Sequence, residues 1–288
     1  MVTTEGLPLG LLNAQCQAPA SRAISDKRDS ADIPIEEKTT FSWIQALHEC
    51  VALAPQIPDT QMVCVMDREA DLFELFDEQR KKPRVELLVR ANHNRKTDDD
   101  DLRLFEAVRQ SPLHSQFLLP VKRQSARPKR SKQKARDQIK ARTAQVQLRY
   151  HPVTLRPPAG QVDKLPITLW VVHVREASPP ADTKPVEWFL LTTCELDDVE
   201  AALACVRWYC LRWRIEDWHR VLKSGCGIEK LAHKTRTRLE RAIAIRLVTD
   251  KRIMHIAMLG RTCPALPAEV LFFDIEIEVL AAYAKKNN

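Results

Sequence analysis

The sequence contains no run of 18 apolar residues and no amino-terminal leader of the secretory type. A helix that crosses a membrane needs about 20 predominantly apolar residues. A signal peptide combines a basic start with an apolar centre and a cleavage site. These absences predict a soluble, cytoplasmic protein with no membrane partner.

The sequence also lacks the cysteine patterns of zinc-binding and disulfide-rich proteins. Its eight cysteines form no Cys-x-x-Cys pair and no Cys/His spacing typical of a metal site. Free cysteines behave as small apolar side chains in protein interiors. We therefore expect reduced, mostly buried thiols, without structural zinc or disulfide bonds.

Positive charge exceeds negative charge. The 45 Lys and Arg residues outnumber the 38 Asp and Glu residues, which gives a net charge of +7 and a pI near 9.0. This balance favours an acidic partner such as nucleic acid, although a mild basic excess is common in proteins without one. The most basic stretch, residues 122–142, has ten Lys or Arg residues against the single Asp137. It is either a solvated segment or a source of salt-dependent affinity for DNA.

The length of the chain allows one domain, or one domain with an inserted lobe. We find no internal repeat. Apolar periodicity predicts helices over residues 40–53, 68–80, 102–108, 199–224, 239–259 and 268–284. Short apolar or alternating runs predict strands over residues 62–66, 85–91, 144–150 and 165–175.

Four side chains recur at helical spacing within residues 209–223. Tyr209, Arg212, Glu216 and Lys223 are separated by three, four and seven residues. On an α-helix, these steps bring the side chains to one face. A carboxylate between two cations is suited to holding a metal ion against a phosphate chain. Taken alone, Glu216 is more simply a surface acid that pairs with a neighbouring arginine.

A second acidic group follows the predicted strand at 62–66. Asp67 stands at the carboxyl end of that strand, and an amphipathic helix is predicted to follow at 68–80. An acid at a strand end and an acid on a distant helix commonly share a divalent cation. An Asp in this place also often caps the next helix, so both roles remain open. We expect Glu69 and Asp71 to be solvated or structural.

Together, the two segments resemble the bacterial cut-and-paste DDE transposases of the Tn-five or insertion-sequence-four type. Residues 67–71 match the Asp-Arg-Glu-Ala-Asp strand end of that family, and residues 209–223 match its Tyr-x2-Arg-x3-Glu-x6-Lys helix. Further similarity runs through residues 85–90, 187–192 and 266–271. The resemblance covers nearly the whole chain. It implies a role in DNA transposition and recombination, in the bacterial cytoplasm at the nucleoid.

The resemblance implies an α/β fold, with an RNase H-like mixed sheet flanked by helices and an inserted β-rich lobe. The expected domains are residues 1–94 as the first part of the catalytic core and residues 95–187 as the inserted lobe. Residues 188–288 would form the rest of the core and the start of a carboxy-terminal helical region. The separation of Asp67 and Glu216 by 149 residues leaves room for the lobe.

The resemblance also assigns the catalytic acids. Asp67 corresponds to the second acid and Glu216 to the third, and both are expected to bind Mg2+, for which Mn2+ is a possible substitute. Cleavage of a phosphodiester needs an activated water or 3'-hydroxyl and stabilisation of the leaving oxygen, and a pair of divalent ions supplies both.

Six further residues correspond to family positions that contact double-stranded DNA at the transposon end or target: Tyr209, Arg212, Lys223, Arg90, His93 and Trp188. The first three are expected to bind phosphates. Arg90 and His93 fall where the family has basic contacts near the cleaved strand. Trp188 corresponds to a tryptophan that stacks on a flipped base, although a tryptophan in a strand is more usually part of the core.

Both ends of the chain differ from the family pattern. Residues 2–12 resemble the second and third strands of a hairpin, joined by a turn at Glu5 and Gly6, which follows the strand of the first catalytic Asp. We therefore expect a catalytic core truncated at both ends, without the first Asp and without most of the carboxy-terminal dimerisation region. We expect such a chain, alone, neither to nick nor to join DNA at a useful rate.

Two other functions remain open. One is a DNA-binding regulatory fragment that inhibits a full-length transposase, by competing for transposon ends or by forming a heterodimer in place of a homodimer. The other is a decayed gene product with no role. The polar residues 249–251, inside a helix that is otherwise apolar, are consistent with decay.

Overall fold

The computed structural model describes residues 1–14, 33–99, 102–123, 138 and 140–287. The chain divides into two compact units. The larger unit runs from Pro19 to Cys210, and the smaller one combines Met1–Ala18 with Leu211–Asn288. Most of the basic stretch at 122–142 lies outside the described residues.

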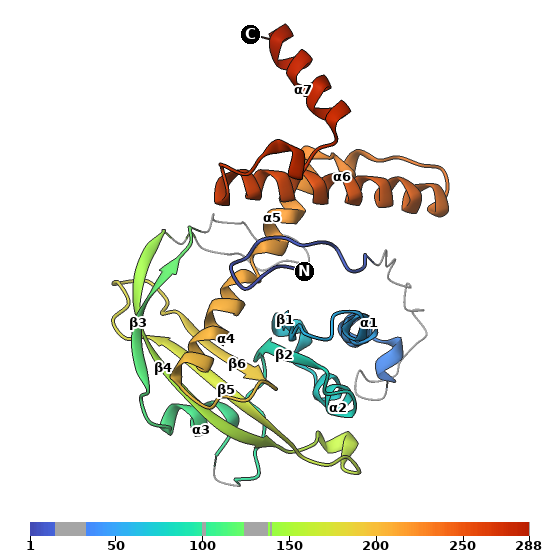
Figure 1. The fold of residues 1–288 in the computed structure, drawn as a ribbon. Coiled ribbons are helices and arrows are strands. Elements are labelled where there is room, and N and C mark those ends of the chain that lie inside the picture. Colours follow the sequence, from blue (N-terminus) through green and yellow to red (C-terminus); the bar gives the residue numbers. More distant parts are fainter. Residues whose placement is uncertain (15–32, 100–101, 124–137, 139, 288) are drawn as a thin grey trace. The chain divides into compact units, whose positions relative to one another are not determined.

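The larger unit is built on one mixed sheet of six strands (Figure 1). Its strand order is β1-β2-β6-β5-β4-β3. β1 and β2 are parallel, and the other neighbouring pairs are antiparallel. The strands are β1 (Met62–Met66), β2 (Val85–Arg90), β3 (Ser115–Val121), β4 (Arg142–Leu155), β5 (Ile167–Glu176) and β6 (Glu187–Thr192).

The parallel pair β1 and β2 determines which loops meet. Both strands are rich in apolar and β-branched residues, which favour a buried strand. Met62 pairs with Val85 and Met66 with Val89, so the two strands end at the same edge of the sheet. The strands predicted at 62–66 and 85–91 are confirmed.

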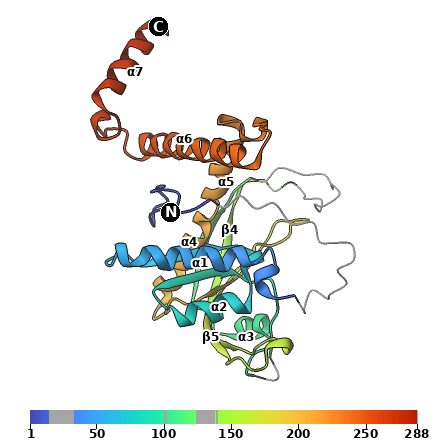
Figure 2. The same ribbon diagram turned by 90° about the vertical axis from the view of Figure 1, so that its right-hand side faces the viewer.

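Helices cover both faces of this sheet (Figure 1, Figure 2). One face carries α1, α2 and α3, and the opposite face carries α4. Successive side chains of a strand point to opposite faces, so Leu87 of β2 belongs to the first core and Leu88 to the second. The bounds of these helices are α1 (Phe41–Leu53), α2 (Phe73–Lys81), α3 (Leu104–Gln110) and α4 (Val199–Leu211).

The helix predicted at 68–80 begins later than expected. Arg68–Ala70 forms a single 3-10 turn, Leu72 is extended, and α2 starts at Phe73. The cause is Asp71, which is 1% exposed and accepts hydrogen bonds from backbone amides more than twenty residues away. These long-range contacts interrupt the local helical pattern.

The prediction of a single helix over residues 199–224 is wrong. α4 ends at Leu211, α5 covers Arg214–Arg220, and Val221–Gly225 forms a turn of π-helix. Between α4 and α5, the amides of Ile215 and Glu216 bond to carbonyls three residues earlier instead of four. Residue spacing across this break no longer guarantees a common face.

The smaller unit is mostly helical. It contains α5, α6 (Arg236–Thr262) and α7 (Asp274–Asn287), and a small core of Leu222, Cys226 and Leu247 joins its central elements. The helix predicted at 239–259 is confirmed within α6. The helix predicted at 268–284 starts only at Asp274, where Glu276 accepts the amide of Phe273 and caps the first turn.

The amino-terminal segment of the smaller unit makes a tight turn. Val2 and Pro8 form one antiparallel bridge, and Gly6 has a φ of +86°. The turn expected at Glu5 and Gly6 is confirmed. In the described residues on either side of it, strand pairing is limited to the bridge of Val2 and Pro8. His255 of α6 holds this segment through its Nδ1, 2.6 Å from the carbonyl oxygen of Pro8.

The fold prediction is confirmed in its coarser part. The chain is mixed α/β, with a mixed sheet flanked by helices that is compatible with an RNase H-like fold. β3, β4 and β5 lie in the segment 95–187 and continue the same sheet through the pairing of β5 with β6. A separate inserted lobe remains a prediction.

The remaining helical elements are short 3-10 turns at Ile35–Glu37, Ala54–Gln56, Ala159–Gln161, Ile228–Lys230 and Ala268–Val270. Within the described residues, no helix has both the length and the apolar character needed to cross a membrane. Seven cysteines lie in the described residues and all are free thiols, of which three are buried, so the expectation of mostly buried thiols is met only in part.

Candidate active site

Asp67 lies directly after β1, at the edge of the sheet where β1 and β2 both end. Its Oδ1 accepts the amide of Glu69 at 3.1 Å and caps the 3-10 turn Arg68–Ala70. The capping role is therefore confirmed. It is compatible with metal binding, because an ionised carboxylate has about four acceptor positions.

Arg90 ends the neighbouring strand. Because Met66 pairs with Val89, Asp67 and Arg90 occupy the next positions on adjacent strands. The Nη2 of Arg90 donates to the carbonyl oxygen of Glu187 at 3.4 Å. A cation therefore ends β2 at the same edge of the sheet where a carboxylate follows β1.

His93 lies three residues beyond Arg90 and is exposed. Its backbone amide donates to Asp71 Oδ2 at 2.9 Å, and its Nε2 lies 3.3 Å from the side-chain amide nitrogen of Asn92. The imidazole is therefore attached to a backbone that the acidic turn after β1 holds in place.

Trp188 and Tyr209 form an aromatic pair on the face covered by α4. Their ring centroids are 5.2 Å apart in an edge-to-face arrangement. Tyr209 is 3% exposed, and the guanidinium carbon of Arg90 lies 6.0 Å from the centroid of the Trp188 ring. Through these contacts Arg90, Trp188 and Tyr209 gather at the end of the larger unit where Asp67 also lies.

The other three predicted site residues belong to the smaller unit. Glu216 is exposed on α5. The guanidinium of Arg212 lies 5.3 Å from the ring centroid of Trp213, and Lys223 pairs with Glu229 at 3.1 Å. A common face for these residues and Tyr209 remains a prediction, because the helix is interrupted between them.

The donor chemistry fits a hard divalent cation. Asp67 and Glu216 offer carboxylate oxygens, which Mg2+ prefers to nitrogen or sulfur. Across the described ranges, no group of three His, Cys, Asp or Glu side chains is gathered to hold a metal ion. Asp67 and Glu216 are therefore ligands of the kind that Mg2+ prefers. Asp67 belongs to the larger unit and Glu216 to the smaller one.

A charged network behind Trp188 was not predicted from the sequence. Glu187 Oε1 lies 3.0 Å from His173 Nε2 and 3.1 Å from Arg109 Nη2. Burial lowers the pKa of His173, so its ring is neutral near pH 7. Burial opposes the charge of Glu187, but the hydrogen bonds from His173 and Arg109 outweigh it and lower the pKa of Glu187. The network fixes the start of β6, which carries Trp188.

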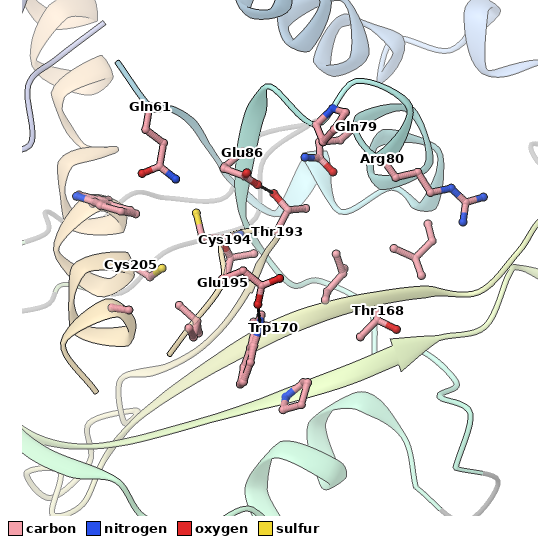
Figure 3. A pocket seen from close by; sticks show the side chains of 18 residues that line it. Gln61, Gln79, Arg80, Glu86, Thr168, Trp170, Thr193, Cys194, Glu195 and Cys205 are labelled. Carbon is pink, nitrogen blue, oxygen red and sulfur yellow. Dashed lines mark hydrogen bonds between the residues drawn. The ribbon is translucent and has the colours of Figure 1, made fainter. Parts of the chain in front are cut away.

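A cleft of about 870 Å3 lies at the opposite end of the sheet, where β1 and β2 begin (Figure 3). Its wall includes the carboxylates of Glu86 and Glu195. Glu86 accepts a hydrogen bond from Thr193, and Glu195 accepts one from the indole of Trp170 at 3.1 Å. This cleft is thus separated from Asp67 by the length of β1 and is not part of the candidate site.

A carboxylate beside phosphate-binding cations is the arrangement of metal-dependent phosphoryl-transfer enzymes. Comparison with protein-family models gives a match to the transposase DDE domain over residues 43–249. This range covers more than half of the chain, so the chain belongs to the DDE transposase family. Members of this family act in DNA transposition, bind DNA and use divalent metal ions, typically Mg2+. The prediction of a DDE transposase is confirmed, whereas the Tn-five or insertion-sequence-four type remains a prediction.

Proposed function

We propose that the chain is the catalytic core of a cut-and-paste transposase of the Tn-five or insertion-sequence-four type, which cleaves transposon ends and joins them to target DNA. The observation that carries the proposal is the position of Asp67 and Arg90 at one edge of the parallel pair β1 and β2. This edge offers an anionic ligand for a metal ion beside a cation for phosphate.

Asp67 and Glu216 would hold Mg2+, or Mn2+ in its place. When bound there, such ions would supply an activated water or 3'-hydroxyl and stabilisation of charge on the leaving oxygen. Arg90 and His93 bind the phosphates that flank the cleaved bond. Tyr209, Arg212 and Lys223 bind the backbone of the transposon end, which positions the DNA without reading its sequence.

Trp188 contributes an indole surface. It is half-buried, with its ring in an edge-to-face contact with Tyr209 and the guanidinium of Arg90 close to the ring. The exposed remainder supports stacking on an unpaired base, which contributes about 1–3 kcal/mol per base. The buried part fixes the orientation of the ring, so packing and stacking are complementary roles of one side chain.

The partners implied by this function are double-stranded DNA at the transposon ends and the target, and a second transposase chain. That second chain is either a copy of this one or a longer relative. The place of action is the bacterial cytoplasm, at the nucleoid.

Metal binding tests the proposal without requiring turnover. Calorimetric titration with Mn2+ should show binding to the unaltered chain that Asp67→Asn and Glu216→Gln each weaken by about tenfold or more. Glu69→Gln is the matched control, since Glu69 is exposed in the same turn and loses the same charge. Equal Mn2+ affinity in Asp67→Asn and the unaltered chain would contradict the proposed role of Asp67.

A further inference from the structure

Asp71 is the most tightly bound acid of the turn that follows β1. It is 1% exposed, and its two carboxylate oxygens receive four hydrogen bonds. Oδ2 accepts the amides of Asn92 at 2.7 Å and His93 at 2.9 Å. Oδ1 accepts Nε of Arg95 at 3.1 Å and Nη2 of Arg95 at 2.8 Å. All four donors come from the segment after β2.

These bonds occupy the acceptor capacity of Asp71. An ionised carboxylate offers about four lone-pair positions, and two donors already point at each oxygen. The guanidinium of Arg95 also balances the charge, as a buried carboxylate requires. Asp71 is therefore excluded as a ligand of a metal ion, although it lies only four residues from Asp67.

The segment after β2 is also held from its other side. The carbonyl oxygen of Arg95 accepts the amide of Leu104 at 3.0 Å, and Asn94 Oδ1 accepts the amide of Phe105 at 2.9 Å. These contacts attach the segment to the first turn of α3. Residues 92–95 are thus fixed between the acidic turn and α3.

We propose that Asp71 is a positioning residue, which sets the place of His93 relative to Asp67. Asp67 and Asp71 share one turn, and Asp71 holds the backbone of His93 directly. The carboxylate assigned to the metal and the imidazole assigned to phosphate thereby become one rigid group. This inference rests on the proposed function, which assigns those two roles.

A purely structural role would give a different result. If Asp71 only stabilised the fold, its substitution would lower the melting temperature but leave the folded site unchanged. A positioning role changes the site while the protein is still folded. The measurement must therefore read the distance between the metal and His93 in the folded state.

Two variants and one control separate these roles. In Asp71→Asn, the one remaining side-chain oxygen can accept hydrogen bonds either from the two backbone amides or from Arg95. The new amide nitrogen is a donor, so it cannot replace the lost acceptor on the other side. Arg95→Lys keeps the charge and the backbone bonds of Asp71 but removes the two-pronged contact. Glu69→Gln removes an exposed charge from the same turn and should change neither readout.

The first readout is amide hydrogen exchange. We expect the amides of Asn92 and His93 to exchange about tenfold faster in Asp71→Asn, the effect of losing one ordinary hydrogen bond. The amides of β2 serve as an internal reference for the folded state and should keep their protection. Arg95→Lys should speed the exchange of these two amides by a smaller factor, because Asp71 Oδ2 still accepts them but Oδ1 loses the contact with Arg95 that fixes the carboxylate.

The second readout is the broadening of NMR signals by Mn2+. In the unaltered chain, Mn2+ at Asp67 should broaden the signals of Arg90 and His93 together. In Asp71→Asn, Arg90 should remain broadened because β2 holds it, while the broadening of His93 is lost. Equal broadening of His93 in both chains would overturn the positioning role. If neither residue broadens in the unaltered chain, the metal assignment of Asp67 fails instead.

If Asp71→Asn does not fold, Arg95→Lys decides the question. Partial loss of His93 broadening in that variant, with Arg90 unchanged, supports the positioning role. Unchanged broadening of both residues in Arg95→Lys rejects it.

Discussion

The ring of Tyr209 meets the ring of Trp188 edge to face, with planes inclined by 66°. Trp188 comes from β6 and Tyr209 from α4, so the pair joins the helix to the sheet. Tyr209 is 3% exposed, so its ring is part of the core. Both residues assigned to DNA contact therefore also support the core.

Substitutions of Tyr209 should separate packing from DNA contact. Tyr209→Ala removes a buried ring and should lower the free energy of unfolding by about 3 kcal/mol or more. Tyr209→Phe keeps the ring and should change stability by less than about 1 kcal/mol. Its affinity for a transposon-end duplex should fall about tenfold, since a hydrogen bond to a charged group contributes about 1.5–3 kcal/mol.

Thermal unfolding and a fluorescence binding assay measure the two effects. Tyr150→Phe is the control, because Tyr150 is a half-buried tyrosine of β4 whose ring packs against His114. If Tyr209→Phe binds DNA as tightly as the control variant, the hydroxyl of Tyr209 makes no phosphate contact.

Gly6 provides a second test, in the smaller unit. Its φ of +86° costs an L-residue about 1–2 kcal/mol. An added Cβ would also lie 2.8 Å from Cδ2 of Leu211. Gly6→Ala should therefore lower the melting temperature of this unit by several degrees. Gly10→Ala is the control, because its nearest atom would lie at an ordinary 3.9 Å. Equal melting temperatures for the two variants would show that the turn adapts.

Much of the fold follows from local sequence. α1 was predicted at 40–53 and is found at Phe41–Leu53, because a strong apolar period ends at Pro55. β2 is found within one residue of its predicted bounds, because an apolar run of that length is typical of a buried strand and too short for most helices. Such elements depend on nearby residues, which the sequence displays directly.

The errors occur where distant contacts override local preference. No glycine or proline marks the break in the helix after Leu211 in the sequence. The break is visible only in the hydrogen-bond pattern of the folded chain. For Asp71 the sequence left a solvated and a structural role open, and the structural one becomes visible only in the folded chain, since its partner Arg95 is 24 residues away. For the site, the placement of Asp67 at a strand end follows from the sequence, whereas its neighbours depend on strand pairing.

The ion pair of Glu176 and Arg142 predicts a dependence of stability on pH. Glu176 is 3% exposed, and its Oε2 lies 2.7 Å from Nη2 of Arg142. The guanidinium holds the pKa of Glu176 below its ordinary value of 4.5, and the amide of Val186 adds to this effect. The unfolded chain therefore takes up the proton first as pH falls. The contribution is complete above pH 4.5 and is lost as pH falls through the lower folded-state pKa.

Glu176→Gln should accordingly cost about 3 kcal/mol at pH 7, and this cost should shrink as the pH is lowered below 4.5, as measured by denaturant unfolding. Glu200→Gln is the matched control, since Glu200 and Arg207 form a pair that is 70% and 57% exposed. Surface pairs contribute less than about 1 kcal/mol. A pH-independent difference between Glu176→Gln and the unaltered chain would argue against the ion pair as the source of stability.

Asp250 of α6 should have the opposite dependence on pH. It is fully buried, and neither carboxylate oxygen has a hydrogen-bond partner in the described part of the chain. Burial raises its pKa from 3.8 to about 6. The folded chain keeps the proton while the unfolded chain releases it, so this group lowers stability between pH 3.8 and about 6 and continues to do so above that range.

Asp250→Asn removes the ionisation and should therefore stabilise the smaller unit by about 1–3 kcal/mol at pH 7.5, with no gain at pH 3.5. Unfolding followed by far-ultraviolet circular dichroism measures the effect, because α6 is the longest helix of the described chain. Glu240→Gln serves as the control, since Glu240 lies on the same helix with Arg236 as its partner at 2.7 Å. A gain of equal size at both pH values would mean that folding does not change the pKa of Asp250, and the gain would then have a cause other than the cost of burying its charge.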